Sequence, residues 1–220
     1  MFRIKICGVR SVVDVENAHI HGADSIGINF FPKSIRYLSP KTDEAQKVSS
    51  VAAERCLLRV GVVVNMSRIQ VEELLEAIQL DAIQLHGDEP VSSAEDWASL
   101  GIPLIRAIKL PSNVLTSEEI SSKCAPWIQA GCHPLFDADA GGAHGGIGRK
   151  LDWDSIRNWQ LDHPNQAFTL AGGLTPDNVA DAILTSGARS VDTASGVEKP
   201  RGCKDSESIR RFVDACSVLG

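Results

Sequence analysis

The 220-residue sequence predicts an α/β protein with the (β/α)8 architecture of a TIM barrel. Eight short, apolar, β-branched segments alternate with amphipathic segments along the chain, and the pattern recurs every roughly 20 to 35 residues. No low-complexity linker or break in composition divides the chain, so we expect a single domain over residues 1–220. A hydrophobic content of 43% is sufficient for a substantial core.

The expected strands are short runs rich in valine, isoleucine and leucine. They cover Arg3–Cys7, Ser25–Phe30, Leu57–Val64, Ala82–His86, Leu104–Lys109, His133–Asp137, Phe168–Ala171 and Ser190–Thr193. A doubly wound open sheet is the alternative, but it normally carries G-x-G-x-x-G after its first strand. Here the first strand ends in Cys7-Gly8-Val9-Arg10. The count of eight strands and the length of 220 residues favour a closed barrel.

The intervening segments have helical periodicity and recognisable ends. Residues Arg68–Ile78 place Ile69, Leu74, Leu75 and Ile78 on an expected apolar face. Helix starts are expected at polar N-cap or first-turn residues, namely Ser67, Asp152, Thr175-Pro176 and Asp205. Left-handed glycines are expected to end helices at Gly22, Gly101 and Gly187.

Composition narrows the class of function. A net charge of -6 argues against a nucleic-acid partner. No stretch approaches the roughly 20 apolar residues that span a bilayer, and charges interrupt the short apolar run at the N-terminus, so we expect neither membrane insertion nor a signal peptide. The six cysteines form no C-x-x-C pair, which favours reduced thiols and a cytoplasmic protein. No exposed apolar stripe is evident, so we expect a monomer.

Functional groups of a (β/α)8 barrel gather at the carboxyl ends of its strands. Cys7, His86, Asp137 and Asp192 stand at four of these expected ends. Glycines follow the last two strands, and backbone amides near glycine and helix N-termini commonly bind phosphate. We therefore expect Gly172, Gly173, Ser195 and Gly196 to bind a phosphate group, although tight turns alone would also explain the glycines.

Short motifs in order along the chain resemble those of the phosphoribosylanthranilate isomerases. They are Lys5-Ile6-Cys7-Gly8, Ser34-Ile35-Arg36-Tyr37, Val60-Gly61-Val62-Val63-Val64-Asn65, Gln84-Leu85-His86-Gly87, Phe136-Asp137 with Gly145-Gly146-Ile147-Gly148 and Leu151-Asp152-Trp153, Leu170-Ala171-Gly172-Gly173-Leu174, and Ser195-Gly196-Val197-Glu198. The resemblance covers nearly the whole chain. Ile147, Ala194 and Leu151 depart from the family pattern, and two of these changes remove a hydroxyl near the expected phosphate site or in the preceding loop.

The resemblance implies an Amadori rearrangement of a phosphoribosyl substrate, N-(5′-phosphoribosyl)anthranilate, in tryptophan biosynthesis. Such a reaction needs an acid to open the sugar ring and a base to remove the C2′ proton, roles that the resemblance assigns to Asp137 and Cys7. Both steps are proton transfers, so neither a metal nor a cofactor is expected. Without the motifs, Cys7 would be interpreted as a small buried apolar residue, and the position of Asp137 would fit a strand-end cap as well as a catalytic group.

The remaining roles follow from the same resemblance and from side-chain chemistry. Arg36 suits the anthranilate carboxylate, Asp192 the anthranilate amine, and His86 a place in the pocket wall or a structural position at the barrel rim. Lys5 lies two residues before Cys7 on the same face and is expected to favour a thiolate there. Asp137 needs a raised pKa, and residues Asp137–Lys150, including Asp139 and His144, are expected to form a mobile lid.

Two other functions remain open from the sequence. The histidine-pathway isomerase performs the same rearrangement on another phosphoribosyl compound, but it characteristically has aspartate where this chain has Cys7. A catalytically silent phosphosugar-binding barrel is the second alternative. The presence of both candidate proton-transfer groups, Cys7 and Asp137, together with Arg36, argues against it.

Overall fold

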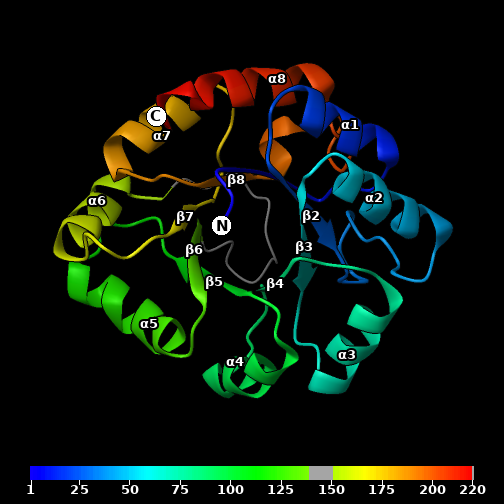
Figure 1. Ribbon diagram of the computed structural model, residues 1–220. Helices are drawn as coiled ribbons and strands as arrows, with labels where there is room; N and C mark the ends of the chain where they lie inside the picture. Colours follow the sequence, from blue (N-terminus) through cyan, green and yellow to red (C-terminus); the bar gives the residue numbers. More distant parts are fainter. Residues whose placement is uncertain (139–150, 220) are drawn as a thin grey trace.

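The computed structural model describes residues 1–138 and 151–219. Within them eight parallel strands close into a barrel in the order of the sequence, with a helix after each strand (Figure 1). The strands are β1 (Ile4–Cys7), β2 (Ser25–Asn29), β3 (Leu58–Val63), β4 (Ala82–Leu85), β5 (Leu104–Leu110), β6 (His133–Ala138), β7 (Thr169–Leu170) and β8 (Val191–Thr193). The fold class is thus confirmed, and each predicted strand overlaps an observed one.

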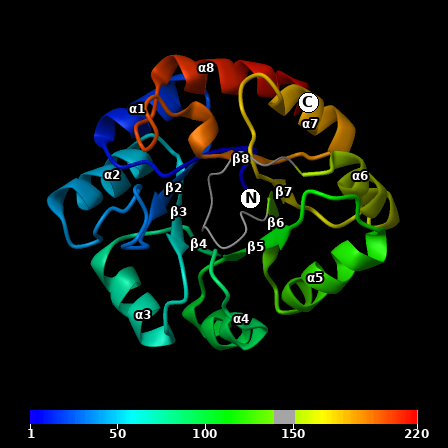
Figure 2. The same ribbon diagram turned by 180° about the vertical axis from the view of Figure 1, so that it is seen from behind.

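Eight α-helices form a ring outside the barrel, as both views along its axis show (Figures 1 and 2). They are α1 (Val12–Ile20), α2 (Asp43–Glu54), α3 (Arg68–Ala77), α4 (Val91–Trp97), α5 (Ser117–Gln129), α6 (Trp153–Asp162), α7 (Val179–Ser186) and α8 (Ser206–Ala215). Helix α8 lies beside α1, and β8 pairs with β1, so the two ends of the chain close the same structure.

Alternation along the strands divides the core into two layers. In β3, Val60 joins an apolar cluster with Ile105, Ala107 and Leu135, whereas Val63 belongs to the larger cluster that includes buried helix residues. Successive side chains of a strand point to opposite faces. Every second residue therefore points into the barrel and the others pack against the helices, which explains why the strands read as almost continuously apolar.

Most predicted helix ends are confirmed. Ser67, Asp152 and Asp205 each accept a hydrogen bond from a backbone N–H of the first turn. The left-handed glycines are also confirmed, with φ values of 94°, 68° and 74° at Gly22, Gly101 and Gly187. The start at Thr175-Pro176 is wrong. Residues 175–178 form a turn in which the Thr175 N–H donates to Asn178 Oδ1, and α7 begins at Val179.

The predicted apolar face of α3 is wrong at one position. Ile69 is 67% exposed, whereas Val71, Leu74 and Ile78 are buried. A helix turns by about 100° per residue, which places residues 71, 74 and 78 together and Ile69 on the opposite side. Apolar character alone therefore does not place Ile69 on the buried face, because its angular position on the helix decides its exposure.

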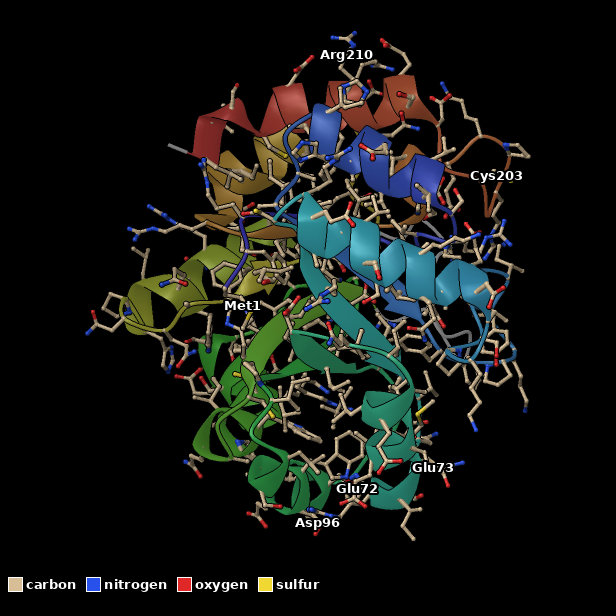
Figure 3. All side chains as sticks on the ribbon, turned by 45° about the vertical axis from the view of Figure 1, so that its right-hand side comes forward. Met1, Glu72, Glu73, Asp96, Cys203 and Arg210 are labelled. Atoms are coloured by element: carbon tan, nitrogen blue, oxygen red, sulfur yellow. The ribbon has the colours of Figure 1, made fainter. Side chains whose placement is uncertain are left out.

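The polar surfaces lie outside this core. Figure 3 shows the side chains of Glu72, Glu73, Asp96 and Arg210 on the outer surface of the helical ring, and Cys203 at the edge of the molecule on the loop after β8. Among the helices that the structure describes, none is long and apolar enough to cross a membrane.

Candidate active site

A cavity opens at the carboxyl ends of the strands. Of the predicted site residues, its lining includes Cys7, Arg36, His86, Asp137, Gly172, Gly173, Asp192 and Ser195. Parallel strands all end on the same side of a barrel, which brings together residues far apart in the sequence. Gly196 lies just behind this lining: a Cβ on it would be 1.9 Å from the Leu174 carbonyl oxygen, so the glycine permits the loops after β7 and β8 to touch.

A buried ion pair lies at the base of the cavity. The register of β1 and β8 places Lys5 beside Asp192, and the Lys5 ammonium lies 2.8 Å from Asp192 Oδ2. Lys5 also donates to Gln84 Oε1 at 3.0 Å from β4. Burial acts to lower the pKa of Lys5, but the neighbouring Asp192 carboxylate outweighs it and the pKa is raised. Lys5 therefore stays charged, and Asp192 Oδ1 is a buried oxygen with no partner.

The thiol of Cys7 lies among charged groups at the end of β1. Gly27 of β2 makes space for it, since a Cβ there would lie 2.7 Å from the Cys7 sulfur. Burial raises the pKa of Cys7, and the Asp192 charge raises it further. Lys5 lowers the pKa, followed by Lys204 and Arg36. The expected effect of Lys5 has the predicted sign, but the net shift is upward because desolvation of a thiolate costs more than these cations return.

Asp137 has the environment expected of an acid. Its side chain is 17% exposed, and burial together with the charge of Asp192 raises its pKa to about 7. The Ala138 N–H donates to Asp137 Oδ1 at 2.9 Å and acts in the opposite direction. His86 Nε2 lies 3.6 Å from Asp137 Oδ2. Asp137 can therefore both hold and release a proton near neutral pH.

Arg36 occupies the rim of the cavity but is not solvated as a surface arginine would be. It is 7% exposed, and its Nε and Nη2 atoms donate to both carboxylate oxygens of Glu198 at 2.6 and 2.7 Å. Lys204 also donates to Glu198 and to the Ala194 carbonyl, at 2.9 Å in each case. Burial works to raise the pKa of Glu198, but the two cations bring it to about 2. Because Glu198 holds one edge of the guanidinium, only the other donors of Arg36 are left to bind a ligand.

The loops after β7 and β8 form one wall of the cavity. Gly172 and Gly173 both have positive φ, 80° and 70°, and a Cβ on Gly172 would lie 2.5 Å from the Ala138 nitrogen. Thr193 donates its hydroxyl to the Leu174 carbonyl at 2.8 Å and so joins the two loops. This bond uses a hydroxyl one residue before Ala194, the position at which this chain lacks the hydroxyl of the family pattern.

Sequence reasoning assigned no role to Gln84, Glu198 or Lys204, although the first two lie within quoted motifs. Gln84 stands two residues before His86, so the two share a face of the predicted strand Ala82–His86, and this spacing was a signal that could have found Gln84. Nothing local indicates that Glu198 and Lys204 would face Arg36. The predicted lid beyond Ala138, with Asp139, His144 and Ile147, lies outside the described residues. Among those that are described, no cluster of three or more His, Cys, Asp or Glu side chains could hold a metal ion.

The family model described as N-(5'phosphoribosyl)anthranilate (PRA) isomerase matches residues 4–215. The chain belongs to the phosphoribosylanthranilate isomerase family. A family member from Zygosaccharomyces bailii is 35% identical over 216 residues, which is 97% of each chain. The crystal structure of the Thermotoga maritima isomerase is 33% identical, with a TM-score of 0.84 over 99% of this chain and 100% of that one.

Two further isomerase structures are informative. One, 30% identical with a TM-score of 0.79 over 99% of this chain and 100% of the other, is a complex with reduced 1-(o-carboxyphenylamino)-1-deoxyribulose 5-phosphate. The other, with the same identity, TM-score and coverage, holds monomers generated from the dimeric Thermotoga maritima isomerase. The resemblance drawn from the motifs is thus confirmed. One of these similar structures contains a bound sugar phosphate, the reduced deoxyribulose 5-phosphate named above.

Proposed function

We propose that Asp137 and Cys7 act as acid and base in the isomerisation of N-(5′-phosphoribosyl)anthranilate to 1-(o-carboxyphenylamino)-1-deoxyribulose 5-phosphate. Asp137 protonates the sugar ring oxygen, the C1′–O bond breaks, and the amine nitrogen becomes an iminium. The Cys7 thiolate then removes the C2′ proton, and the resulting enolamine tautomerises to the ketone. No atom is gained or lost, and the whole reaction needs only proton transfers.

The observation that supports this proposal is that one cavity contains both a group able to donate a proton and a group able to accept one. Asp137 has a pKa raised to about 7, which keeps an acid available near neutrality. Cys7 lies in the same cavity, with the charges of Lys5, Lys204 and Arg36 opposing the cost of forming a thiolate. A purely structural cysteine or strand-end cap would not require cationic groups on this side of the barrel.

The other predicted residues fit substrate binding in this scheme. The donors of Arg36 that Glu198 does not hold suit the anthranilate carboxylate, and the unpartnered Asp192 Oδ1 suits the anthranilate amine. The loops with Gly172, Gly173 and Ser195 suit the phosphate, with Gly196 holding the loops in contact. His86 lies against Asp137.

Turnover of freshly prepared phosphoribosylanthranilate, followed by loss of anthranilate-type fluorescence, tests the proposal. Cys7→Ala and Asp137→Asn should each lower kcat by about 10²–10⁴-fold, as removal of a general acid or base does. Their affinity for a product analogue should stay within about tenfold, because these groups act mainly in the transition state. Cys56→Ser is a matched control, since Cys56 is exposed at the end of α2. Near-normal kcat in Cys7→Ala would show that the assigned base is wrong.

We further propose that residues 1–220 act as one domain and as a monomer in the cytoplasm. The closed barrel uses β1 and β8 as neighbours, which supports one domain. All six cysteines are free thiols, which supports a reducing compartment. Because one relative is dimeric, sedimentation of the purified protein should be used to measure its oligomeric state.

A further inference from the structure

A continuous line of polar contacts crosses the floor of the cavity from β8 to β6. Asp192 pairs with Lys5 at 2.8 Å, and Lys5 donates to Gln84 Oε1 at 3.0 Å. Gln84 Nε2 lies 3.1 Å from His86 Nδ1, and His86 Nε2 lies 3.6 Å from Asp137 Oδ2. The line therefore joins the ion pair beside Cys7, by way of β4, to the acid in β6. Gln84, at its centre, is only 1% exposed.

Chemistry sets the direction of each contact along this line. A lysine ammonium has three donors and no acceptor, so the amide atom of Gln84 that faces Lys5 must be the oxygen. The amide nitrogen then faces His86, and an amide nitrogen can only donate. His86 Nδ1 must accept that hydrogen bond, which means that it carries no proton. The orientation of Gln84, often ambiguous in an amide, is decided here by the charge of Lys5.

The tautomer of His86 follows from this arrangement. A neutral imidazole with an accepting Nδ1 carries its proton on Nε2, the nitrogen that faces Asp137. The Nε2–H group is therefore a donor 3.6 Å from Asp137 Oδ2, while the Ala138 N–H donates to Oδ1 at 2.9 Å. At 3.6 Å the His86 contact is too long for a full hydrogen bond, and a small movement would complete it.

We propose that Gln84 is a positioning residue for the acid: it fixes His86 in the Nε2–H tautomer so that His86 stabilises the Asp137 carboxylate formed when the acid gives up its proton. This inference rests on the proposed role of Asp137. Forming a buried carboxylate costs free energy. A hydrogen-bond donor whose contact with Asp137 strengthens as negative charge develops on the carboxylate therefore lowers the barrier to proton transfer. Gln84 itself touches no reacting atom in this scheme.

Gln84→Glu is the most discriminating substitution. Glutamate has the same shape and still accepts from Lys5, so the ion-pair cluster keeps its acceptor. Its second oxygen also accepts, however, and so forces a proton onto His86 Nδ1. The imidazole then is either the Nδ1–H tautomer, which offers no donor to Asp137, or the imidazolium, whose charge favours premature ionisation of Asp137. The first form makes Asp137 a weaker acid, and the second leaves less of it protonated and able to act. Gln84→Met removes the donor and the acceptor together, so residue 84 no longer donates a hydrogen bond to His86 Nδ1.

The tautomer is measured directly by ¹⁵N NMR of protein with labelled histidine, with the His86 signals assigned by their loss in His86→Asn. In the unaltered protein near pH 7 we expect protonated Nε2 and bare Nδ1. In Gln84→Glu we expect protonated Nδ1. Protonated Nδ1 in the unaltered protein, or bare Nδ1 in Gln84→Glu, would overturn the proposal. This reading is independent of turnover, so it separates failure of the proposal from failure of the assigned function.

Kinetics supply the second half of the test. Gln84→Glu and Gln84→Met should lower kcat by at least about tenfold with little change in KM, as expected when a hydrogen bond to a charged group is lost mainly in the transition state. Gln129→Glu, an exposed glutamine at the end of α5, is the matched control and should retain kcat. A kcat within twofold of normal in Gln84→Glu, in protein whose NMR shows the changed tautomer, would refute the positioning role.

Discussion

Asp137 illustrates what the surroundings of one side chain do to its chemistry. Burial and the charge of Asp192 raise its pKa to about 7, while Lys5 and Lys109 act in the opposite direction with the Ala138 N–H. In the same cavity, burial raises the pKa of Cys7. In the proposed roles, the form with protonated Asp137 and ionised Cys7 is therefore a minority species at neutral pH. The surrounding charges partly offset one another, so neither group is held entirely in its reactive protonation state.

The raised pKa of Asp137 has a measurable cost in stability. An unfolded aspartate ionises near pH 3.9, whereas the folded one ionises at about 7, so between these values the folded state binds more protons and stability falls as pH rises. Asp137→Asn should therefore be more stable than the unaltered protein by about 2–4 kcal/mol at pH 8, and the gain should vanish as pH falls toward 4. Urea unfolding at several pH values measures this difference.

An exposed aspartate provides the control for this experiment. Asp214, on α8, has a side chain that is 60% exposed. Asp214→Asn should show no comparable gain that grows between pH 4 and pH 8. A constant difference between Asp137→Asn and the unaltered protein across this range would show that the folded carboxyl ionises at an ordinary pH.

Elements far apart in the sequence are tied together at the rim of the barrel. The loop after β2 carries Arg36 and the loop after β8 carries Glu198 and Lys204, and all three charged groups are largely buried. Gly202 adds a backbone N–H to Glu198 at 2.8 Å. One carboxylate thus balances two cations, and it holds both loops in place around the cavity. The conformation of either loop depends on the other.

Removing the charge of Glu198 should loosen this rim. Glu198→Gln leaves Arg36 and Lys204 buried without a counter-ion, and breaking a buried pair in this way costs about 3–5 kcal/mol. Glu207→Gln is a close control, because Glu207 pairs with Arg210 through the same two-bond geometry on the surface. Its loss should cost far less, because water solvates this exposed pair. Denaturant unfolding compares the two, and equal losses would show that burial of the Glu198 cluster has no energetic consequence.

At the scale of the whole molecule, the barrel is not equally strong around its circumference. Strands β5 and β6 share six register pairs, whereas β7 contains only two residues and pairs with β8 at Leu170 and Val191. A second cavity lies at the other end of the barrel beside Phe168 and Ser190. Side-chain hydrogen bonds that join the Thr169 hydroxyl to His133 and to Ser190 partly support this side. The β7–β8 side is therefore the expected place for local opening.

Native-state hydrogen exchange measures this difference. The backbone amide of Leu170, which donates to the Ser190 carbonyl at 2.8 Å, should exchange at least about tenfold faster than amides in the middle of β5 and β6, because local opening there breaks fewer backbone hydrogen bonds. The β5 and β6 amides serve as an internal reference in the same sample. Equal protection on both sides would show that the barrel opens only by global unfolding.

The sequence by itself determined the order and type of the elements and the end of the barrel that carries chemistry. Alternating apolar strands and amphipathic helices report local periodicity, which depends on neighbours a few residues away. Cys7, His86, Asp137 and Asp192 were found from their position at expected strand ends, because parallel strands share one direction. The errors at Ile69 and Thr175 are local ones, in which an angular position and a turn were misread.

Only the tertiary structure decided which charges meet. Arg36 and Glu198 are 162 residues apart, and no local pattern states that the carboxylate occupies one edge of the guanidinium. The pairing of Lys5 with Asp192 depends on the register by which β1 closes on β8, and the direction of Gln84 depends in turn on Lys5. The pKa values follow from the same contacts, because burial and charge act through space. Local sequence therefore indicated the type of chemistry, whereas the charge pairs and the pKa values that control it arose from closure of the barrel.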